Sequence, residues 1–204
     1  MGVINDVRKL TNLSYVNLYQ LKATSIHNTP VIYNVASRAR AVSELKLKSH
    51  ENKPDGVIIY SLYGEKKDRV VLVRQYRYTL DDYIYEFPAG LVEDGEDFHK
   101  AAIRELREET GLILDPIPVD NSYEKPYFTT IGMTDESCAT VYGYASGSVT
   151  KEGQEDSEEI EIVLADRQEV RRILLREENV AIMCAYMLMH FLDEEKEPFS
   201  FLKY

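Results

Sequence analysis

Three glutamates near the middle of the chain have a spacing that places carboxylates side by side on a helix. Glu105 is followed, three and four residues later, by Glu108 and Glu109, within a segment from Asp97 to Thr110 that has helical apolar periodicity. Like charges at this spacing destabilise a bare helix unless a cation neutralises them. Mg²⁺ and Mn²⁺ take hard oxygen ligands and complete their coordination with water and phosphate oxygens. The pattern therefore fits two alternatives, a solvated acidic face or a divalent metal site that receives a phosphorylated substrate.

The surroundings of these glutamates favour the metal site. On a helical wheel the acidic patch borders an apolar stripe, so the carboxylates are expected to be partly buried. Arg104 lies one turn before Glu108 and can neutralise one charge but not three. Gly111 is placed to end the helix in a left-handed conformation. The core-facing stripe consists of Phe98, Ala102, Leu106 and Thr110, with Ile103 at its edge.

The net negative charge of the whole chain also indicates that binding an anionic substrate would need a cation. The 204 residues include 24 lysines and arginines against 35 aspartates and glutamates, a formal net charge of −11. Such a surface repels nucleic acid and anionic lipid, so neither a nucleic acid nor a membrane is expected as a partner. An anionic substrate needs a metal ion or a few placed arginines to approach this chain.

The remaining composition indicates a cytoplasmic protein. Cys138 and Cys184 lack paired metal-ligand spacing and are expected to be free thiols in a reducing compartment. The N-terminus lacks the basic patch and apolar run of a signal peptide. The longest apolar stretch, 180–192, is too short to span a bilayer.

The order of the predicted elements indicates an α/β protein in two parts. Residues 1–50 predict a small β-rich lobe, and residues 51–204 predict the main domain. Strands followed by a central helix, further strands and terminal helices indicate a mixed sheet packed between helices. Strands are expected at 15–19, 31–35, 57–63, 69–76, 83–87, 139–144 and 159–164, and near 127. Helices are expected at 97–110, from Asp166 as N-cap to Arg176, and over 180–192 with Asn179 as N-cap.

The residues around the glutamates resemble a complete Nudix box, the signature of hydrolases that act on a nucleoside diphosphate linked to another group. The match runs from Gly90 through Glu96 to Arg104-Glu105-Leu106-Arg107-Glu108-Glu109-Thr110-Gly111-Leu112, and every fixed position is filled. The resemblance implies a Nudix-type α/β/α sandwich with a mixed sheet. It also implies that Mg²⁺ is required, with Mn²⁺ as a possible substitute.

The resemblance assigns a role to each residue of the box. Glu105, Glu108 and Glu109 are implied as metal ligands, and the backbone carbonyl of Ala89 completes the site. Arg104 orients the glutamates. Outside this ligand set, Gly90 and Gly111 are structural and Glu96 braces the loop.

The segments flanking the box are similar to the ADP-ribose pyrophosphatase branch of the family, which includes relatives acting on nucleoside diphosphate sugars. The similarity lies in Arg74-Gln75-Tyr76-Arg77, in the run from Glu86 to Gly90, and in the run from Tyr33 to Arg38. In that branch the N-terminal lobe forms a homodimer whose substrate pocket draws on both subunits. One departure concerns the substrate: where the branch has Ser-Pro-Gly after the box, this chain has Thr130-Ile131-Gly132.

The branch also suggests which side chains meet the substrate and activate water. Arginine binds a diphosphate through two parallel hydrogen bonds, and we expect this role for Arg77 and, from the partner subunit, for Arg38. Glu86 is a further substrate-binding candidate. The acidic run 152–159 precedes a strand, which by itself is typical of a solvated turn. By resemblance, Glu158 is the added metal ligand and Asp156 or Glu155 is the general base. Glu136 is an alternative candidate to these residues of the acidic loop.

Together these observations predict a homodimeric, Mg²⁺-dependent enzyme. The expected reaction is hydrolysis of the pyrophosphate bond of ADP-ribose or a related nucleoside diphosphate sugar, giving a nucleoside monophosphate and a sugar phosphate. Two alternatives remain at this point. One is hydrolysis of another nucleotide, such as a dinucleoside polyphosphate or a dinucleotide cofactor. The other is a sensor that binds a nucleotide sugar without turnover.

Overall fold

The computed structural model describes residues 1–155, 158–193 and 197–202. The chain divides into two compact units, one of Met1–Asp55 with Pro126–Cys138 and the other of Gly56–Lys125 with Ala139–Tyr204. The first unit therefore includes a segment that lies far along the chain from the lobe expected at residues 1–50.

The first unit is built on a three-stranded antiparallel sheet in which β2 is the central strand. The strand expected at 15–19 begins later, because the side chain of Asn17 accepts a hydrogen bond from the Leu13 N–H and donates to the Leu13 carbonyl. That contact closes a turn over the residues between them. The segment Lys46–Ser49 forms the short helix α1. The strands are β1 (Val3–Lys9), β2 (Asn17–Thr24) and β3 (Pro30–Ser37), and β9 (Tyr127–Phe128) pairs with the start of β10.

The second unit is built on a larger sheet whose main path runs β11-β5-β4-β10-β8. The predicted hairpin of 57–63 and 69–76 is confirmed as the antiparallel pair β4 and β5. Two short strands extend the sheet, since β6 pairs with β5 and β7 pairs with β4. The strands are β4 (Gly56–Tyr63), β5 (Arg69–Arg77), β6 (Asp82–Glu86), β7 (Ala89–Leu91), β8 (Ile113–Pro116), β10 (Ser137–Ser146) and β11 (Ile160–Ala165).

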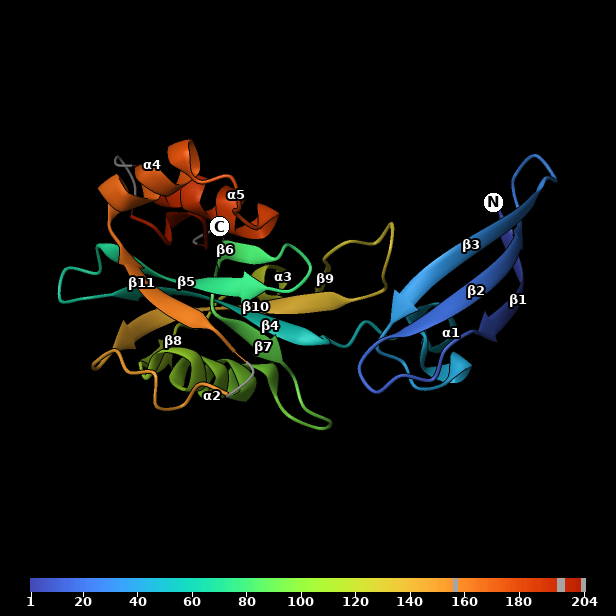
Figure 1. The fold of residues 1–204 in the computed structure, drawn as a ribbon, viewed down its shortest axis with the longest axis horizontal. Helices are drawn as coiled ribbons and strands as arrows, with labels where there is room; N and C mark the ends of the chain where they lie inside the picture. The colour runs from blue at the N-terminus through green and yellow to red at the C-terminus, as the bar shows by residue number, and fades with distance from the viewer. Residues whose placement is uncertain (156–157, 194–196, 203–204) are drawn as a thin grey trace. The chain divides into compact units, whose positions relative to one another are not determined.

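Helices cover both faces of this sheet, as Figure 1 shows. Successive strand residues point to opposite faces. Accordingly, Val57 and Ile59 pack with the buried residues of α2 (Phe98–Thr110), whereas Tyr60 and Leu62 pack with those of α4 (Arg167–Arg176) and α5 (Ile182–Phe191). The two hydrophobic cores lie on opposite sides of the sheet, which confirms the predicted α/β sandwich. The remaining short helices are the 3₁₀ turns Val42–Glu44 and Ser200–Leu202 and the single turn α3 (Asn121–Glu124).

The helix ends follow the sequence signals in two cases and depart from them in a third. The carboxylate of Asp97 accepts from the N–H groups of His99 and Lys100 and begins α2, and Gly111 ends it in the left-handed region. Asp166 begins α4 in the same way. The prediction that Asn179 caps the last helix is wrong.

The side chain of Asn179 is engaged with β6 instead. It donates to the Asp82 carboxylate at 3.0 Å and to the Tyr83 carbonyl at 3.1 Å. The Asn179 carbonyl also accepts from the Tyr85 N–H. These bonds extend the backbone past Val180, so α5 begins only at Ile182.

Two simple properties complete the description. Within the described ranges, none of the helices combines the length and apolar character that crossing a bilayer requires. Cys138 and Cys184 are both free thiols, and burial raises the pKa of Cys138 to about 11.

Candidate active site

The most deeply buried acidic side chain in the described part of the second unit is that of Glu109, in the last turn of α2. It is 3% exposed, and its Oε2 accepts a hydrogen bond from the Ala89 N–H of β7 at 3.3 Å. Burial raises the pKa of this carboxyl well above its ordinary value, and the negative charges of Glu158 and Glu105 raise it further. A buried carboxylate beside two others is stable only with a cation or a proton on it.

Glu105 lies one turn earlier on α2 and rests directly on the backbone of Gly90. A Cβ built on Gly90 would lie 1.9 Å from the Glu105 Cδ, so only glycine leaves room for this carboxylate. Burial raises the pKa of Glu105, while the guanidinium of Arg104 opposes that rise. The charges of Glu108 and Glu158 raise it again. The absence of a side chain at Gly90 therefore leaves the space that the Glu105 carboxylate occupies beside Glu109.

Arg104 contacts both helical glutamates and the loop that precedes the helix. Its Nη1 donates to Glu105 at 2.7 Å and to Glu108 at 3.1 Å, and its Nη2 donates to the Leu91 carbonyl at 3.0 Å. It also forms a two-pronged ion pair with Glu96, at 3.1 and 2.9 Å, which is the main reason that the pKa of Glu96 is lowered. Since one guanidinium joins both helical glutamates to the preceding loop, it holds their carboxylates in place. These contacts match the orienting and bracing roles expected for Arg104 and Glu96.

Strand register places two further predicted residues, Arg77 and Glu86, on the face of the sheet that α2 covers. Glu158 comes just before β11, whose first residue, Ile160, pairs with Gln75 of β5. Arg77 donates through Nε to Glu86 at 2.7 Å. The positive charge of Arg77 lowers the pKa of Glu109 and the negative charge of Glu158 raises it, so both side chains lie near the buried carboxylate.

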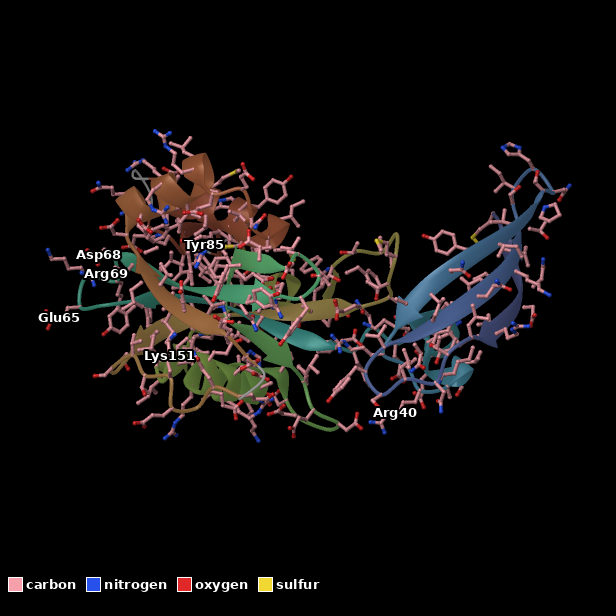
Figure 2. All side chains as sticks on the ribbon, viewed as in Figure 1. Arg40, Glu65, Asp68, Arg69, Tyr85 and Lys151 are labelled. Atoms are coloured by element: carbon pink, nitrogen blue, oxygen red, sulfur yellow. The ribbon has the colours of Figure 1, made fainter. Side chains whose placement is uncertain are left out.

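The opposite face of the same strands carries a different set of side chains. Arg74 pairs there with Glu161 at 3.0 Å and lies over the ring of Tyr83. Tyr85, labelled in Figure 2, packs under α4 and accepts a hydrogen bond from Arg172 at 3.1 Å. The alternation of β5 and β6 therefore separates a structural face from the face that carries Arg77, Glu86 and Glu109.

The donor set of the box fits a divalent metal ion. Three carboxylates, those of Glu105, Glu108 and Glu109, supply the hard oxygen ligands that Mg²⁺ requires, and two of them have raised pKa values that a cation would reverse. Among the described residues, no group of three acidic, histidine or cysteine side chains already converges on one ligand position. Instead, Glu105 and Glu108 both accept hydrogen bonds from Arg104.

Two other candidates, Arg38 and Glu136, belong to the first unit and are paired with each other. The Nε and Nη2 of Arg38 donate to Glu136 Oε1 at 3.0 and 2.9 Å. Glu136 also accepts from the hydroxyl of Thr129 at 3.2 Å. Asp156, a candidate general base, lies outside the described residues.

Substitution of Gly90 by alanine tests whether the position of the Glu105 carboxylate matters for activity. We expect kcat to fall about 10–100-fold, because the new Cβ displaces the Glu105 carboxylate and a shift of about 1 Å at a catalytic group has effects of this size. We expect little loss of thermal stability, since the clashing atoms are the far end of a side chain, which can rotate away without a shift of the backbone. Steady-state kinetics and a thermal melt of the same preparation measure both. Wild-type kcat in this variant would show that Glu105 is not needed at this position.

The family model of the NUDIX domain matches residues 52–185, which is well over half of the chain, so this protein belongs to the Nudix family. The sequence-based assignment is thereby confirmed. A solved structure described as an ADP compounds hydrolase matches with a TM-score of 0.67 over 92% of this chain and 90% of that chain. Since the two sequences are only 15% identical, this likeness supports the Nudix fold alone.

Relatives of known name place the chain near one branch of the family. A Caenorhabditis elegans protein named as a nudix hydrolase is 30% identical over 150 residues, covering 71% of this chain and 66% of that protein. A Saccharomyces cerevisiae ADP-ribose pyrophosphatase is 48% identical over 57 residues, covering 28% of this chain and 25% of that protein. The chain thus matches less than two thirds of the length of either relative. A Bacillus subtilis ADP-ribose pyrophosphatase is 27% identical over 139 residues, covering 67% and 71%.

Proposed function

We propose that this protein hydrolyses the pyrophosphate bond of ADP-ribose or a related nucleoside diphosphate sugar, with Mg²⁺ as cofactor. The observation that carries the proposal is the buried carboxylate of Glu109 beside Glu105, with Arg77 on the adjoining strand. This arrangement offers carboxylate ligands for a cation, and a guanidinium that can donate two parallel hydrogen bonds to a diphosphate, at one place. The named ADP-ribose pyrophosphatases among the relatives support the substrate class.

The proposed reaction is attack of water on one phosphorus of the diphosphate, with cleavage of the bridging P–O bond. The products are a nucleoside monophosphate and a sugar phosphate, which for ADP-ribose are AMP and ribose 5-phosphate. Bound Mg²⁺ supplies charge neutralisation and lowers the pKa of water. Glu105, Glu108 and Glu109, with the Ala89 carbonyl, would hold that ion, and Arg104 orients Glu105 and Glu108 by donating to both carboxylates.

Two further side chains serve the substrate and the water. Arg77 donates to the diphosphate, and Glu86 fixes its guanidinium at 2.7 Å so that the remaining N–H groups point in a set direction. Glu158 lies just before β11 and its charge acts on Glu105 and Glu109, so it is proposed as the added ligand or the group that takes the proton from water. Glu155, Asp156 and Glu136 are retained as rivals for the general base.

A nucleotide panel tests the function. The wild-type protein is incubated with ADP-ribose, other nucleoside diphosphate sugars, dinucleoside polyphosphates and dinucleotide cofactors in the presence of Mg²⁺, with phosphate release coupled to a phosphatase. We expect ADP-ribose or another nucleoside diphosphate sugar to be turned over fastest, and turnover to disappear in Glu108→Gln. A preference for a dinucleotide would assign the alternative substrate class, which Thr130-Ile131-Gly132 permits. Tight binding without turnover would identify a sensor.

We further propose that the protein acts in the cytoplasm as a homodimer formed through its first unit, with Arg38 serving the partner's substrate pocket. The sheet of that unit leaves apolar side chains exposed, among them Val3 and Ile32, each at 59%. The two free thiols agree with a reducing compartment. Light scattering after size-exclusion chromatography gives the mass, and a monomer at micromolar concentration would reject the dimer.

A further inference from the structure

The first part of the loop between β10 and β11, residues 147–155, is docked on the last turn of the box helix. Thr150 donates from its N–H to the Thr110 carbonyl at 3.0 Å. The backbone of Gly153 lies against Glu108 so closely that a Cβ there would be 2.8 Å from the Glu108 carbonyl oxygen. Figure 1 shows residues 147–155 passing beside α2, and Figure 2 labels Lys151 among them. The loop is therefore fitted to the helix by backbone contacts.

The side chain of Gln154 links this loop to the box helix. Its Nε2 donates to the Glu109 carbonyl at 2.7 Å and lies 3.5 Å from the Ile160 carbonyl. The last four carbonyls of a helix have no partner within it, so the first bond satisfies a group that the helix itself leaves open. One amide thereby connects the main chain of a buried catalytic glutamate to the first residue of β11.

A second anchor holds the other end of the loop. The Glu159 carbonyl accepts from the Tyr76 N–H at 3.0 Å, and the Glu159 carboxylate accepts from the hydroxyl of Tyr83. The guanidinium of Arg74 lies 4.3 Å over the Tyr83 ring. This anchor is on the sheet face that carries α4, whereas Gln154 acts on the face that carries α2. Glu158 lies between the two anchors.

We propose that Gln154 is a positioning residue, which ties the loop to the box helix and so holds Glu158 beside Glu105 and Glu109. The inference rests on the proposed function and adds to it the device that aligns the loop carboxylate with the helix carboxylates. Residue type matters here, because only a side chain with an N–H donor and the length of glutamine completes the link. Without it, Glu158 keeps its N–H bond to the Glu155 carbonyl and the anchor at Glu159, but the side-chain link from Gln154 to the box helix is lost.

The consequence is a loss of alignment rather than of folding. Displacing a catalytic group by about 1 Å lowers rates by about 100-fold, so we expect Gln154→Ala to lower kcat about 10–100-fold. KM for the nucleotide should stay within about twofold, since Arg77 is held on β5 by its ion pair with Glu86. The Mg²⁺ concentration for half-maximal activity should rise, because Glu158 is displaced as a ligand. Gln154→Glu should behave like Gln154→Ala, since a carboxylate cannot donate to the Glu109 carbonyl.

A double-mutant cycle tests whether Gln154 acts through Glu158. If it does, Gln154→Ala has no further effect on kcat in a Glu158→Gln background. Gln168→Ala, on the exposed surface of α4, is the matched control and should leave kcat and the Mg²⁺ requirement unchanged. Multiplying effects in the cycle, or wild-type kcat in Gln154→Glu, would overturn the proposal.

Hydrogen–deuterium exchange separates this proposal from the proposed function, because it needs no substrate. In the metal-free protein, amides at 158–160 should exchange faster in Gln154→Ala than in the wild type and in Gln168→Ala. If the wild type hydrolyses no nucleotide but exchange rises as expected, the reaction is wrong and the docking stands. Unchanged exchange in Gln154→Ala would overturn the docking itself.

Discussion

Replacing Glu109 with glutamine is expected to lower kcat about 1,000-fold and at the same time to raise the melting temperature of the metal-free protein. The loss of rate follows from removing one proposed ligand of the cation, since a 1,000-fold change in rate corresponds to about 4 kcal/mol of transition-state stabilisation. The gain in stability follows from removing a carboxylate that is 3% exposed and stands beside Glu105 and Glu158. Glutamine keeps the acceptor oxygen for the Ala89 N–H and carries no charge.

The pH dependence of the metal-free protein follows from the same group. Burial raises the pKa of Glu109 well above its ordinary value of 4.5, so the folded state holds a proton that the unfolded chain releases. The stabilisation from this proton is complete below pH 4.5 and is lost as pH rises through the folded-state pKa. We therefore expect the melting temperature of the wild type to fall over that range, and to fall less in Glu109→Gln. At pH 8 the variant should melt at least ~2 °C higher, the effect of ~1 kcal/mol in a chain of this size.

Thermal melts in chelator at several pH values, with kinetics at saturating Mg²⁺, measure the two effects. Glu161→Gln is the matched control, because Glu161 pairs with Arg74 on the opposite face of the sheet and is 51% exposed at its side chain. That control should keep wild-type kcat. A Glu109→Gln protein that is both less stable without metal and fully active would contradict the site.

The sequence predicted the box helix well because each signal there is local. Asp97 as N-cap, Gly111 as the left-handed end and the apolar stripe on one side depend on neighbours within a few residues. The resemblance marked Gly90 as structural, and the structure shows the reason, which is the packing of Glu105 on its backbone. Local signals therefore predicted this helix, whereas the metal-ligand roles of its glutamates came from the resemblance to the Nudix box.

Features set by contacts distant in sequence could not be obtained in this way. Asn179 is an adequate helix cap by residue type, but β6 offers it Asp82 and the Tyr83 carbonyl instead. β1 was missed because its residues are mostly exposed, so burial left no alternation to detect. Gln154 looked like one polar residue in an acidic turn, and only the folded chain brings it to the Glu109 carbonyl.

The pairing of Arg38 with Glu136 is a further contact between residues distant in sequence that sequence reasoning did not predict. Sequence resemblance gave one a substrate role and the other a possible role as base, and the fold joins them at 2.9 Å within the first unit. Neither charge is then free to act without breaking that contact. Any role of Arg38 at a partner's diphosphate thus requires that the phosphate compete with the Glu136 carboxylate, which a dianionic group is able to do.

Chelation of divalent ions is expected to bring turnover down to the uncatalysed background, and Mg²⁺ is expected to restore it and to stabilise the fold. In the metal-free protein Arg104 is the main counter-charge for Glu105 and Glu108, and it does not reach the Glu109 carboxylate by any hydrogen bond found among the described residues. An ion at 100 times its Kd stabilises the folded state by about 2.7 kcal/mol, a melting-temperature rise of about 5–10 °C.

This stabilisation should grow with pH, because Mg²⁺ binds the ionised carboxylates and the raised pKa values of Glu105 and Glu109 keep them protonated in acid. Calorimetric melts with and without Mg²⁺ at pH 5 and pH 8 measure it, with Glu109→Gln and Glu161→Gln as the matched pair. The first variant should lose most of the Mg²⁺-dependent rise and the second should keep it. An equal rise in both would place the bound ion elsewhere on this acidic surface, and turnover that persists in chelator would reject the metal-dependent reaction.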